Sequence, residues 1–224
     1  MVTAITAQNS RGVWSSWPLS GRQVREQLEA VLSDIRPGAA KTGMLASAAV
    51  VREVARAIRK HEVPNLVIDP VIRAKDGTRL IDDDGLRALK QELLPLACLV
   101  TPNAPEAAAL SGMPVRTLRQ ARAAAEKILA LGCSAVLIKG GHLPRIKGRV
   151  IDLYYDGRFR EIPRVAIPVA PRGTGCVLSA AIAAMLARRL PMLAAVRETR
   201  SFLQRALRSP QAVGSGRPSL LPFS

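Results

Sequence analysis

The stretch Asn65-Leu66-Val67-Ile68-Asp69-Pro70 (NLVIDP) decides the fold class. Its apolar run predicts a short buried strand that ends at a carboxylate and a proline. Before it, residues 47–60 have the pattern of a helix and residues 39–44 that of another strand. A strand, a helix and a second buried strand in this order predict parallel strands with helices on both faces of the sheet.

The same alternation continues along the chain. Further strands are predicted at residues 2–7, 98–101 and 135–139, and an antiparallel hairpin at residues 152–155 and 159–163. Further helices are predicted at residues 20–35, 83–93, 104–110, 117–131, 175–187 and 191–207. Ser20 is a suitable N-cap for the first helix, whose apolar stripe consists of Val24, Leu28, Val31, Leu32 and Ile35. We expect one α/β domain over residues 1–208 and a flexible tail rich in Gly, Pro and Ser over residues 209–224.

The composition predicts a soluble cytoplasmic protein. A chain of 224 residues that is 48% hydrophobic is long enough for one sizeable core. No apolar run reaches the length of a membrane span, and the first residues lack the pattern of a signal peptide. Cys98, Cys133 and Cys176 show no metal-ligand pairing and no even disulfide set, which fits a reducing compartment. We expect Cys98 and Cys133 to be small buried hydrophobic residues.

The net charge of +16 raises the question of a polyanionic partner. The arginines, however, are spread through the predicted helices without a run of five like charges, and only 3% of the residues are aromatic. This distribution favours a solvated basic surface. A nucleic-acid binder therefore remains an alternative supported by charge alone.

Polar residues follow the predicted strands or begin a helix at six places, where ligands of such sheets collect. These places are Gln8 with Asn9, Lys41 to Met44, Asp69, Asn103 with Glu106, Lys139 to His142, and Gly173 to Cys176. Six polar positions of this kind exceed what a scaffold needs. They predict a binding site at one edge of the sheet.

Each position also has a structural interpretation. Gly173, Thr174, Gly175 and Cys176 at a helix start predict an anion site, although a plain capping turn is about equally consistent. Asn103 and Glu106 lie three apart and could hold Mg²⁺, or Glu106 could simply favour the helix dipole. Asp69 could anchor a metal or cap a helix. Lys139 could supply a mobile positive charge at the site, or it could be an ordinary solvated lysine. We expect His142 to be a turn residue.

In combination these segments resemble the successive signatures of the hydroxymethylpyrimidine and phosphomethylpyrimidine kinases, members of the ribokinase-like group. The resemblance runs from about Thr3 to Ala187 and keeps the order of the motifs. The motifs are TAQNSRGV (6–13), KTGML (41–45), DPV (69–71) with AKDG (74–77), TPNAPEA (101–107), IKGGH (138–142) and GTGC (173–176).

The resemblance implies an ATP- and Mg²⁺-dependent phosphotransferase of thiamin biosynthesis with a small-molecule substrate. It assigns Asn103 and Glu106 to the Mg-nucleotide and places Lys139 near the phosphates. Cys176 corresponds to the residue that acts at the phosphoryl acceptor, Gln8 to one that hydrogen-bonds the pyrimidine, and Met44 to one that packs on its ring. It implies no specific nucleic acid and no membrane partner, and it leaves room for a homodimer.

The chain also departs from the family pattern. A first strand with a loop of the type GSDSGGGAG does not precede Met1, and Arg172 stands where the family usually has histidine. We therefore expect a partly open substrate site and an unpaired sheet edge beside an apolar patch. Two alternatives remain at this stage: a pyridoxal kinase, and a catalytically idle protein that binds a nucleotide or a pyrimidine phosphate.

Overall fold

Six strands form the central sheet, whose order follows the chain. The structure is a computed structural model, and it describes residues 1–224 except 75–76, 167–170, 208–210, 213, 217 and 221–224. The strands are β3 (Ala40–Thr42), β4 (Leu66–Ile68), β5 (Leu99–Val100), β6 (Val136–Ile138), β7 (Arg149–Tyr155) and β8 (Phe159–Val165). β3 to β6 are parallel, whereas β7 and β8 form the predicted antiparallel hairpin.

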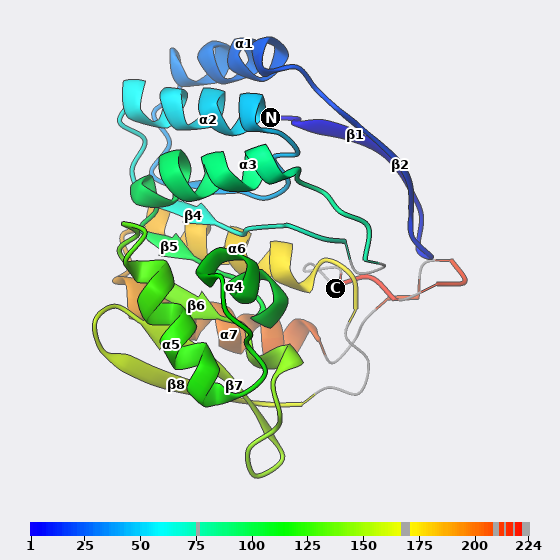
Figure 1. Cartoon of the computed structure of the whole chain (residues 1–224), viewed down its shortest axis with the longest axis vertical. Coiled ribbons are helices and arrows are strands. Elements are labelled where there is room, and N and C mark those ends of the chain that lie inside the picture. The colour runs from blue at the N-terminus through cyan, green and yellow to red at the C-terminus, as the bar shows by residue number, and fades with distance from the viewer. Residues whose placement is uncertain (75–76, 167–170, 208–210, 213, 217, 221–224) are drawn as a thin grey trace.

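Helices cover both faces of this sheet, which confirms the predicted fold class (Figure 1). One face packs against α1 (Gly21–Leu32), α2 (Ala48–Lys60), α3 (Asp83–Ala88), α4 (Ala104–Ser111) and α5 (Leu118–Leu129). The other face packs against α6 (Thr174–Ala187) and α7 (Met192–Ala206). β4 shows the reason for the double layer: Leu66 and Ile68 enter the first core and Val67 enters the second, so every residue of this strand is apolar.

Two predicted helices differ from the expectation: one ends earlier, and the other changes its helix type. α1 begins with the expected Ser20 cap, reinforced by Gln23 in a capping box, but it ends at Leu32. Ile35 lies beyond the end of the helix and is exposed, and Val31, although it lies within the helix, is exposed as well, so neither belongs to the buried stripe. The helix predicted at residues 83–93 leaves the α conformation after Ala88, continuing as a π turn (Leu89–Leu93) and a 3₁₀ turn (Leu94–Leu96). Pro95 explains the change, because it has no N–H group and cannot extend an α-helix.

The strand predicted at residues 2–7 exists as β1 (Ala4–Gln8), but the expectation that it joins the parallel sheet is wrong. β1 pairs with β2 (Val13–Pro18) in a separate two-stranded hairpin, which extends away from the helical layers (Figure 1). The sequence analysis missed β2. Its tryptophans, Trp14 and Trp17, are 76% and 55% exposed, so no buried apolar run marks this strand.

The outer edge of β3 pairs with no strand within the part of the chain that the structure describes. At the C-terminus, described residues of the tail contact the rest of the domain. The N–H of Arg172 donates to the carbonyl of Pro218, and the side chain of Leu220 is buried at 6% exposure. The flexibility predicted for residues 209–224 stays a prediction. In the described residues, no helix is long and apolar enough to span a membrane.

Candidate active site

One cavity of about 1620 Å³ lies at the carboxyl ends of the parallel strands. It is larger than the ~300–1,000 Å³ of ordinary ligand pockets, because it continues along the outer edge of β3 between apolar side chains of α1 and α2. All ten site residues predicted from the sequence line it, namely Gln8, Met44, Asp69, Asn103, Glu106, Lys139, Gly173, Thr174, Gly175 and Cys176. The parallel order of the strands explains this convergence of distant segments.

Lys139, directly after β6, lies between two buried carboxylates. Its Nζ atom is 2.8 Å from Oδ1 of Asp69 and 3.6 Å from Oε2 of Glu106, and its side chain is 15% exposed. Burial lowers the pKa of Lys139, but the two carboxylates outweigh burial and raise it, so the ammonium group is charged at neutral pH. The lysine is therefore held in ion pairs, in contrast to the mobile charge expected from the sequence.

Burial has the opposite consequence for Glu106. It raises the pKa of this carboxyl group, and the neighbouring charge of Asp69 acts in the same direction, whereas Lys139 and the N–H of Asn103 oppose the increase. Glu106 is 6% exposed, and its carboxyl group lies near the like charge of Asp69. A further positive charge at this place would stabilise its ionised form.

The first turn of α4 orients Glu106. The side chain of Asn103 accepts the N–H of Glu106 at 2.9 Å, and Oε2 of Glu106 accepts the N–H of Asn103 at 2.7 Å. This reciprocal pair is a capping box, which the sequence analysis did not predict, since it offered only the helix dipole as the structural role of Glu106. The cap does not compete with a role in the cavity, because it fixes the carboxylate beside Lys139.

The start of α6 faces the ion pair of Lys139 and Asp69. Gly173 is the N-cap with a φ of 82°, a conformation that favours glycine, and no side chain caps this helix. The first N–H groups therefore lack an intrahelical acceptor and can hold an anion. A Cβ atom on Gly175 would lie 3.4 Å from Nζ of Lys139 and 3.5 Å from Oδ2 of Asp69. Cys176 follows, with an exposed thiol.

The β1–β2 hairpin and the residues after β3 supply another part of the wall. Gln8 is exposed at the end of β1, and Met44 is half-buried. The hydroxyl of Thr3 donates to the carbonyl of Met44 at 2.6 Å, which fastens the base of the hairpin. At the tip, the guanidinium of Arg172 donates to the carbonyl of Asn9. Arg172 thus connects the hairpin to the segment that leads into α6.

Two arginines of the cavity wall, Arg164 and Arg200, escaped the sequence analysis. The available signal was Asp152, a carboxylate inside the apolar run of β7, because a carboxylate buried in a sheet requires a cationic partner.

Lys75 and Asp76 of the AKDG motif (74–77) lie outside the described residues. Cys98 and Cys133, which the sequence predicts to be buried, are both free thiols. Cys133 is buried and Cys98 is half-buried, and burial raises the pKa of both thiols to about 11.

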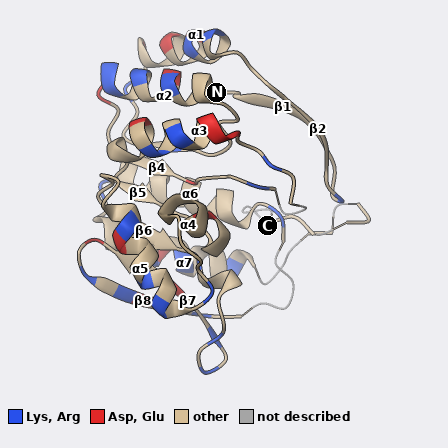
Figure 2. Cartoon of the chain, viewed as in Figure 1, with Lys and Arg blue, Asp and Glu red and all other residues tan. Residues whose placement is uncertain are grey.

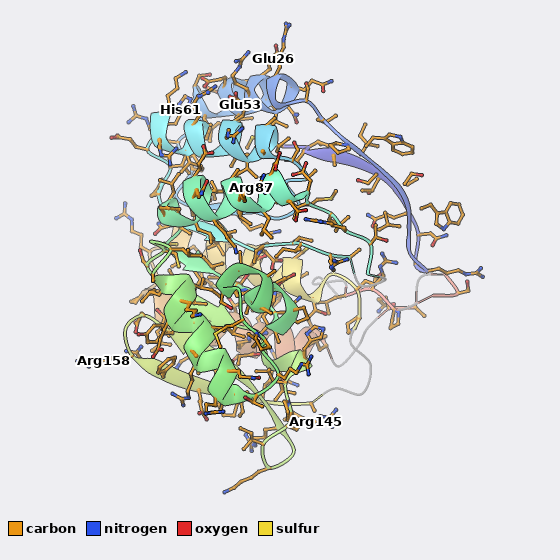
Figure 3. The ribbon with its side chains drawn as sticks, viewed as in Figure 1. Glu26, Glu53, His61, Arg87, Arg145 and Arg158 are labelled. Carbon is orange, nitrogen blue, oxygen red and sulfur yellow. The ribbon has the colours of Figure 1, made fainter. Side chains whose placement is uncertain are left out.

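Lys and Arg occur on many helices, strands and loops along the ribbon and are interspersed with Asp and Glu (Figure 2). Arg87, Arg145 and Arg158 lie on separate parts of the molecule (Figure 3). Two arginines of α2 are held in ion pairs: Arg52 pairs with Glu92 and Arg56 with Glu53. This arrangement favours the predicted solvated basic surface over a nucleic-acid interface.

Comparison with known proteins agrees with the motifs. Residues 1–220 match the model of the phosphomethylpyrimidine kinase family. The chain is 38% identical over 217 residues to the hydroxymethylpyrimidine/phosphomethylpyrimidine kinase of Bacillus subtilis, covering 96% of this chain and 80% of that protein. It is 39% identical over 209 residues to the protein of the same name from Escherichia coli, covering 92% of this chain and 78% of that protein.

Solved structures lead to the same group. A crystal structure of phosphomethylpyrimidine kinase from Clostridium difficile superposes with a TM-score of 0.79 at 34% identity, covering 92% of this chain and 84% of that one. A pyridoxal kinase from Staphylococcus aureus in complex with pyridoxal gives 0.87 at 30% identity, covering 98% and 80%. The family match, the relatives and the cavity at the strand ends lead to one conclusion: the chain belongs to the phosphomethylpyrimidine kinase family, on the ribokinase-like fold.

Proposed function

We propose that this chain phosphorylates hydroxymethylpyrimidine, its monophosphate, or both, with ATP as the donor, as a step of thiamin biosynthesis. The observation that carries the proposal is the ammonium group of Lys139, ion-paired with Asp69 and placed against Gly175 at the uncapped start of α6. The names of the relatives support this choice of substrate.

The groups around Lys139 suit a phosphoryl transfer. Such a reaction depends on positioning and on stabilisation of the negative charge that spreads over the transferred group. Lys139 supplies a fixed positive charge, and the N–H groups of Thr174, Gly175 and Cys176 supply donors that need no reorganisation. In this proposal Gly173 lets the chain turn tightly enough to present those donors.

The acceptor lies beside the hairpin. Gln8 hydrogen-bonds the pyrimidine and Met44 packs on its ring, while Cys176 accepts the proton of the hydroxyl group that attacks the phosphorus. Only the alcohol needs such a base. The phosphate oxygen of the monophosphate is already largely ionised at neutral pH.

The residues present also fit Mg²⁺. Asp69 and Glu106 are 2% and 6% exposed and share a single ammonium group, so this buried corner has an excess negative charge. Carboxylate oxygens are the ligands that Mg²⁺ prefers, and these two would hold it, with Asn103 keeping Glu106 in place. When bound, the ion neutralises charge on the donor's phosphates. Asn103 would act on the metal indirectly, either by holding Glu106 through the cap or by binding a water molecule of the ion.

A pyridoxal kinase is the second candidate, because pyridoxal kinases are among the similar solved structures. The KTGM, TPN and KGGH motifs favour the pyrimidine substrate. A homodimer and a cytoplasmic location stay predictions of the sequence.

Release of ADP from Mg-ATP distinguishes these candidates when it is measured separately with hydroxymethylpyrimidine, its monophosphate and pyridoxal. We expect turnover with at least one pyrimidine, with kcat/KM above that for pyridoxal. A preference for pyridoxal would select the second candidate. Turnover with none of the three, together with measurable nucleotide binding, would indicate an idle binding protein.

A further inference from the structure

Asp152 is a buried carboxylate behind the wall of the cavity. It lies on β7, is 0% exposed, and does not line the cavity. Oδ1 accepts the N–H of Gly140 at 2.7 Å. Oδ2 lies 2.7 Å from Nη2 of Arg200 on α7 and 3.4 Å from Nε of Arg164 on β8. One carboxylate thus connects the turn after β6 with two cationic side chains of the cavity wall.

The surroundings explain why a charge can remain buried there. A buried carboxylate is costly unless cations and hydrogen bonds compensate it. Arg200 is 8% exposed, and burial lowers its pKa while Asp152 opposes this change and Arg164 adds to it. A lone backbone N–H would be satisfied by a neutral acceptor. The ion pair therefore does more than satisfy Gly140: it fixes where the accepting oxygen lies.

Gly140 immediately follows Lys139, so its N–H belongs to the peptide group that leaves the lysine. On the other side, the N–H of Lys139 donates to the carbonyl of Pro102 at 2.8 Å. A Cβ atom on Gly140 would lie 1.8 Å from the carbonyl oxygen of Ile151, which shows that the turn is pressed against β7. The backbone of Lys139 is thus anchored before and after its Cα atom, and this sets the direction of its side chain.

We propose that Asp152 is a positioning residue for phosphoryl transfer: held by Arg200, it orients the peptide group after Lys139 and so aims the ammonium group at the transferred phosphoryl group. The inference rests on the role proposed above for Lys139. The competing interpretation is that Asp152 only stabilises the fold. The two interpretations differ in what happens when Lys139 is absent.

A double-mutant cycle with D152N and K139A makes this distinction, with kcat and KM measured under Mg-ATP and the pyrimidine accepted by the native protein. In D152N an amide NH₂ group replaces the oxygen that faces Arg200 and Arg164, and this group cannot accept from them. The oxygen that accepts the N–H of Gly140 is then no longer held in place. Misplacement of a reacting group by about 1 Å can cost ~100-fold, and we expect kcat to fall about 10- to 100-fold, with KM for the pyrimidine within about threefold. In the K139A background, D152N should change kcat by less than about threefold.

An equal loss from D152N in both backgrounds would overturn the inference while leaving Lys139 its role. No loss from K139A alone would overturn the role of Lys139 and the inference with it. As a matched control, the pair R122Q and E161Q removes an ion pair between α5 and β8 whose side chains are 38% and 40% exposed. This pair should leave kcat within about twofold of the native value.

Two further variants keep the test decisive if D152N does not fold. The pair D152L/R200M replaces the ion pair by apolar side chains of similar volume, which proteins often tolerate, but it offers no acceptor to Gly140. The pair D152N/R200Q is uncharged and keeps an acceptor. We expect the first pair to lose about 10- to 100-fold in kcat and the second to stay within about threefold. A folded D152L/R200M variant with native kcat would refute the proposal.

Discussion

The two parts of the cavity are held in different ways. Around Lys139, charged side chains are buried and connected by ion pairs that join β4, α4 and β6. At the β1–β2 hairpin, Gln8 is exposed, and hydrogen bonds without buried ion pairs fasten the hairpin: Thr3 bonds to Met44, Arg172 to Asn9, Gly216 to Ser10 and Arg11 to Ser215. Figure 1 shows that the hairpin stands apart from the layered body to which β6 belongs.

This difference has a consequence for catalysis. Fixed charges stabilise a transition state because they need no reorganisation when the reaction occurs. A hairpin fastened by hydrogen bonds at its base and tip, without buried ion pairs, can admit and enclose a substrate, which is an effect on binding. We therefore expect substitutions around Lys139 to lower kcat and substitutions at the hairpin to raise KM for the pyrimidine.

The largest effect is expected for Asp69→Asn. This change removes the carboxylate that is 2.8 Å from Nζ of Lys139, together with one of the two proposed Mg²⁺ ligands. Removal of one preorganised electrostatic group typically costs ~100- to 1,000-fold in kcat, and we expect a loss in that range from steady-state ADP release. Asp34→Asn, at an exposed position after α1, is the matched control and should leave kcat unchanged. A rise in KM without a loss of kcat would contradict the comparison.

Glu106→Gln should lower kcat less, by about 10- to 100-fold, because Asp69 remains and the amide preserves the cap with Asn103. The Mg²⁺ concentration needed for half-maximal activity should rise. Glu126→Gln on α5 is the control.

The same variant tests the pKa of Glu106. Because burial raises this pKa in the folded state, the folded protein keeps the proton after the unfolded chain has lost it near its usual pKa of about 4.3. The native protein then loses stability as the pH rises from about 4.3 through the raised pKa. Urea unfolding over this pH range should show Glu106→Gln gaining stability relative to the native protein as the pH rises. A difference that is constant with pH would refute this assignment.

Cys176 lies in the first turn of α6 and lines the cavity, and its substitution should separate the two acceptors. The alcohol keeps its proton near neutral pH, whereas the monophosphate has a second pKa of about 6 and attacks with an oxygen that is already largely ionised. Cys176→Ala should therefore slow phosphorylation of the alcohol by about 10- to 100-fold and that of the monophosphate by less than threefold, about the error of comparing two rates. An equal loss with both substrates would instead place Cys176 in the anion pocket or the packing.

Local signals predicted most of the fold. The apolar run of β4 and the hairpin of β7 and β8 are both encoded within a few residues, and the structure contains them as expected. β2 was missed because Trp14 and Trp17 are exposed, so the strand has no buried side to reveal it. The exposed position of Ile35 depends on where α1 ends, which periodicity alone does not determine.

The site shows the same limit. Residue types at strand ends predicted which side chains meet, since parallel strands end at one edge. Their mutual geometry was not predictable: Lys139 and Asp69 are 70 residues apart in the sequence, and only the register of β4, β5 and β6 brings them to 2.8 Å. Arg200 was missed for this reason as well, because its partner Asp152 lies on a different element.

The smallest effect is expected for Gln8→Ala. Gln8 ends β1, where the register shifts between Ala7 and Gln8, and it is exposed at the cavity. Losing one hydrogen bond to a neutral ring costs about 1 kcal/mol, which corresponds to a rise in KM of roughly five- to tenfold. We expect kcat to stay within twofold, about the error of the assay, since no charge near Lys139 changes. Gln120→Ala on α5 is not a neutral control, because its side chain accepts the N–H of Arg116; Ser15→Ala on β2, which keeps the hairpin pairing, serves instead. If Gln8→Ala lowered kcat and left KM unchanged, the hairpin would act on the transition state, and the division of the cavity into a fixed catalytic part and an adjustable binding part would fail.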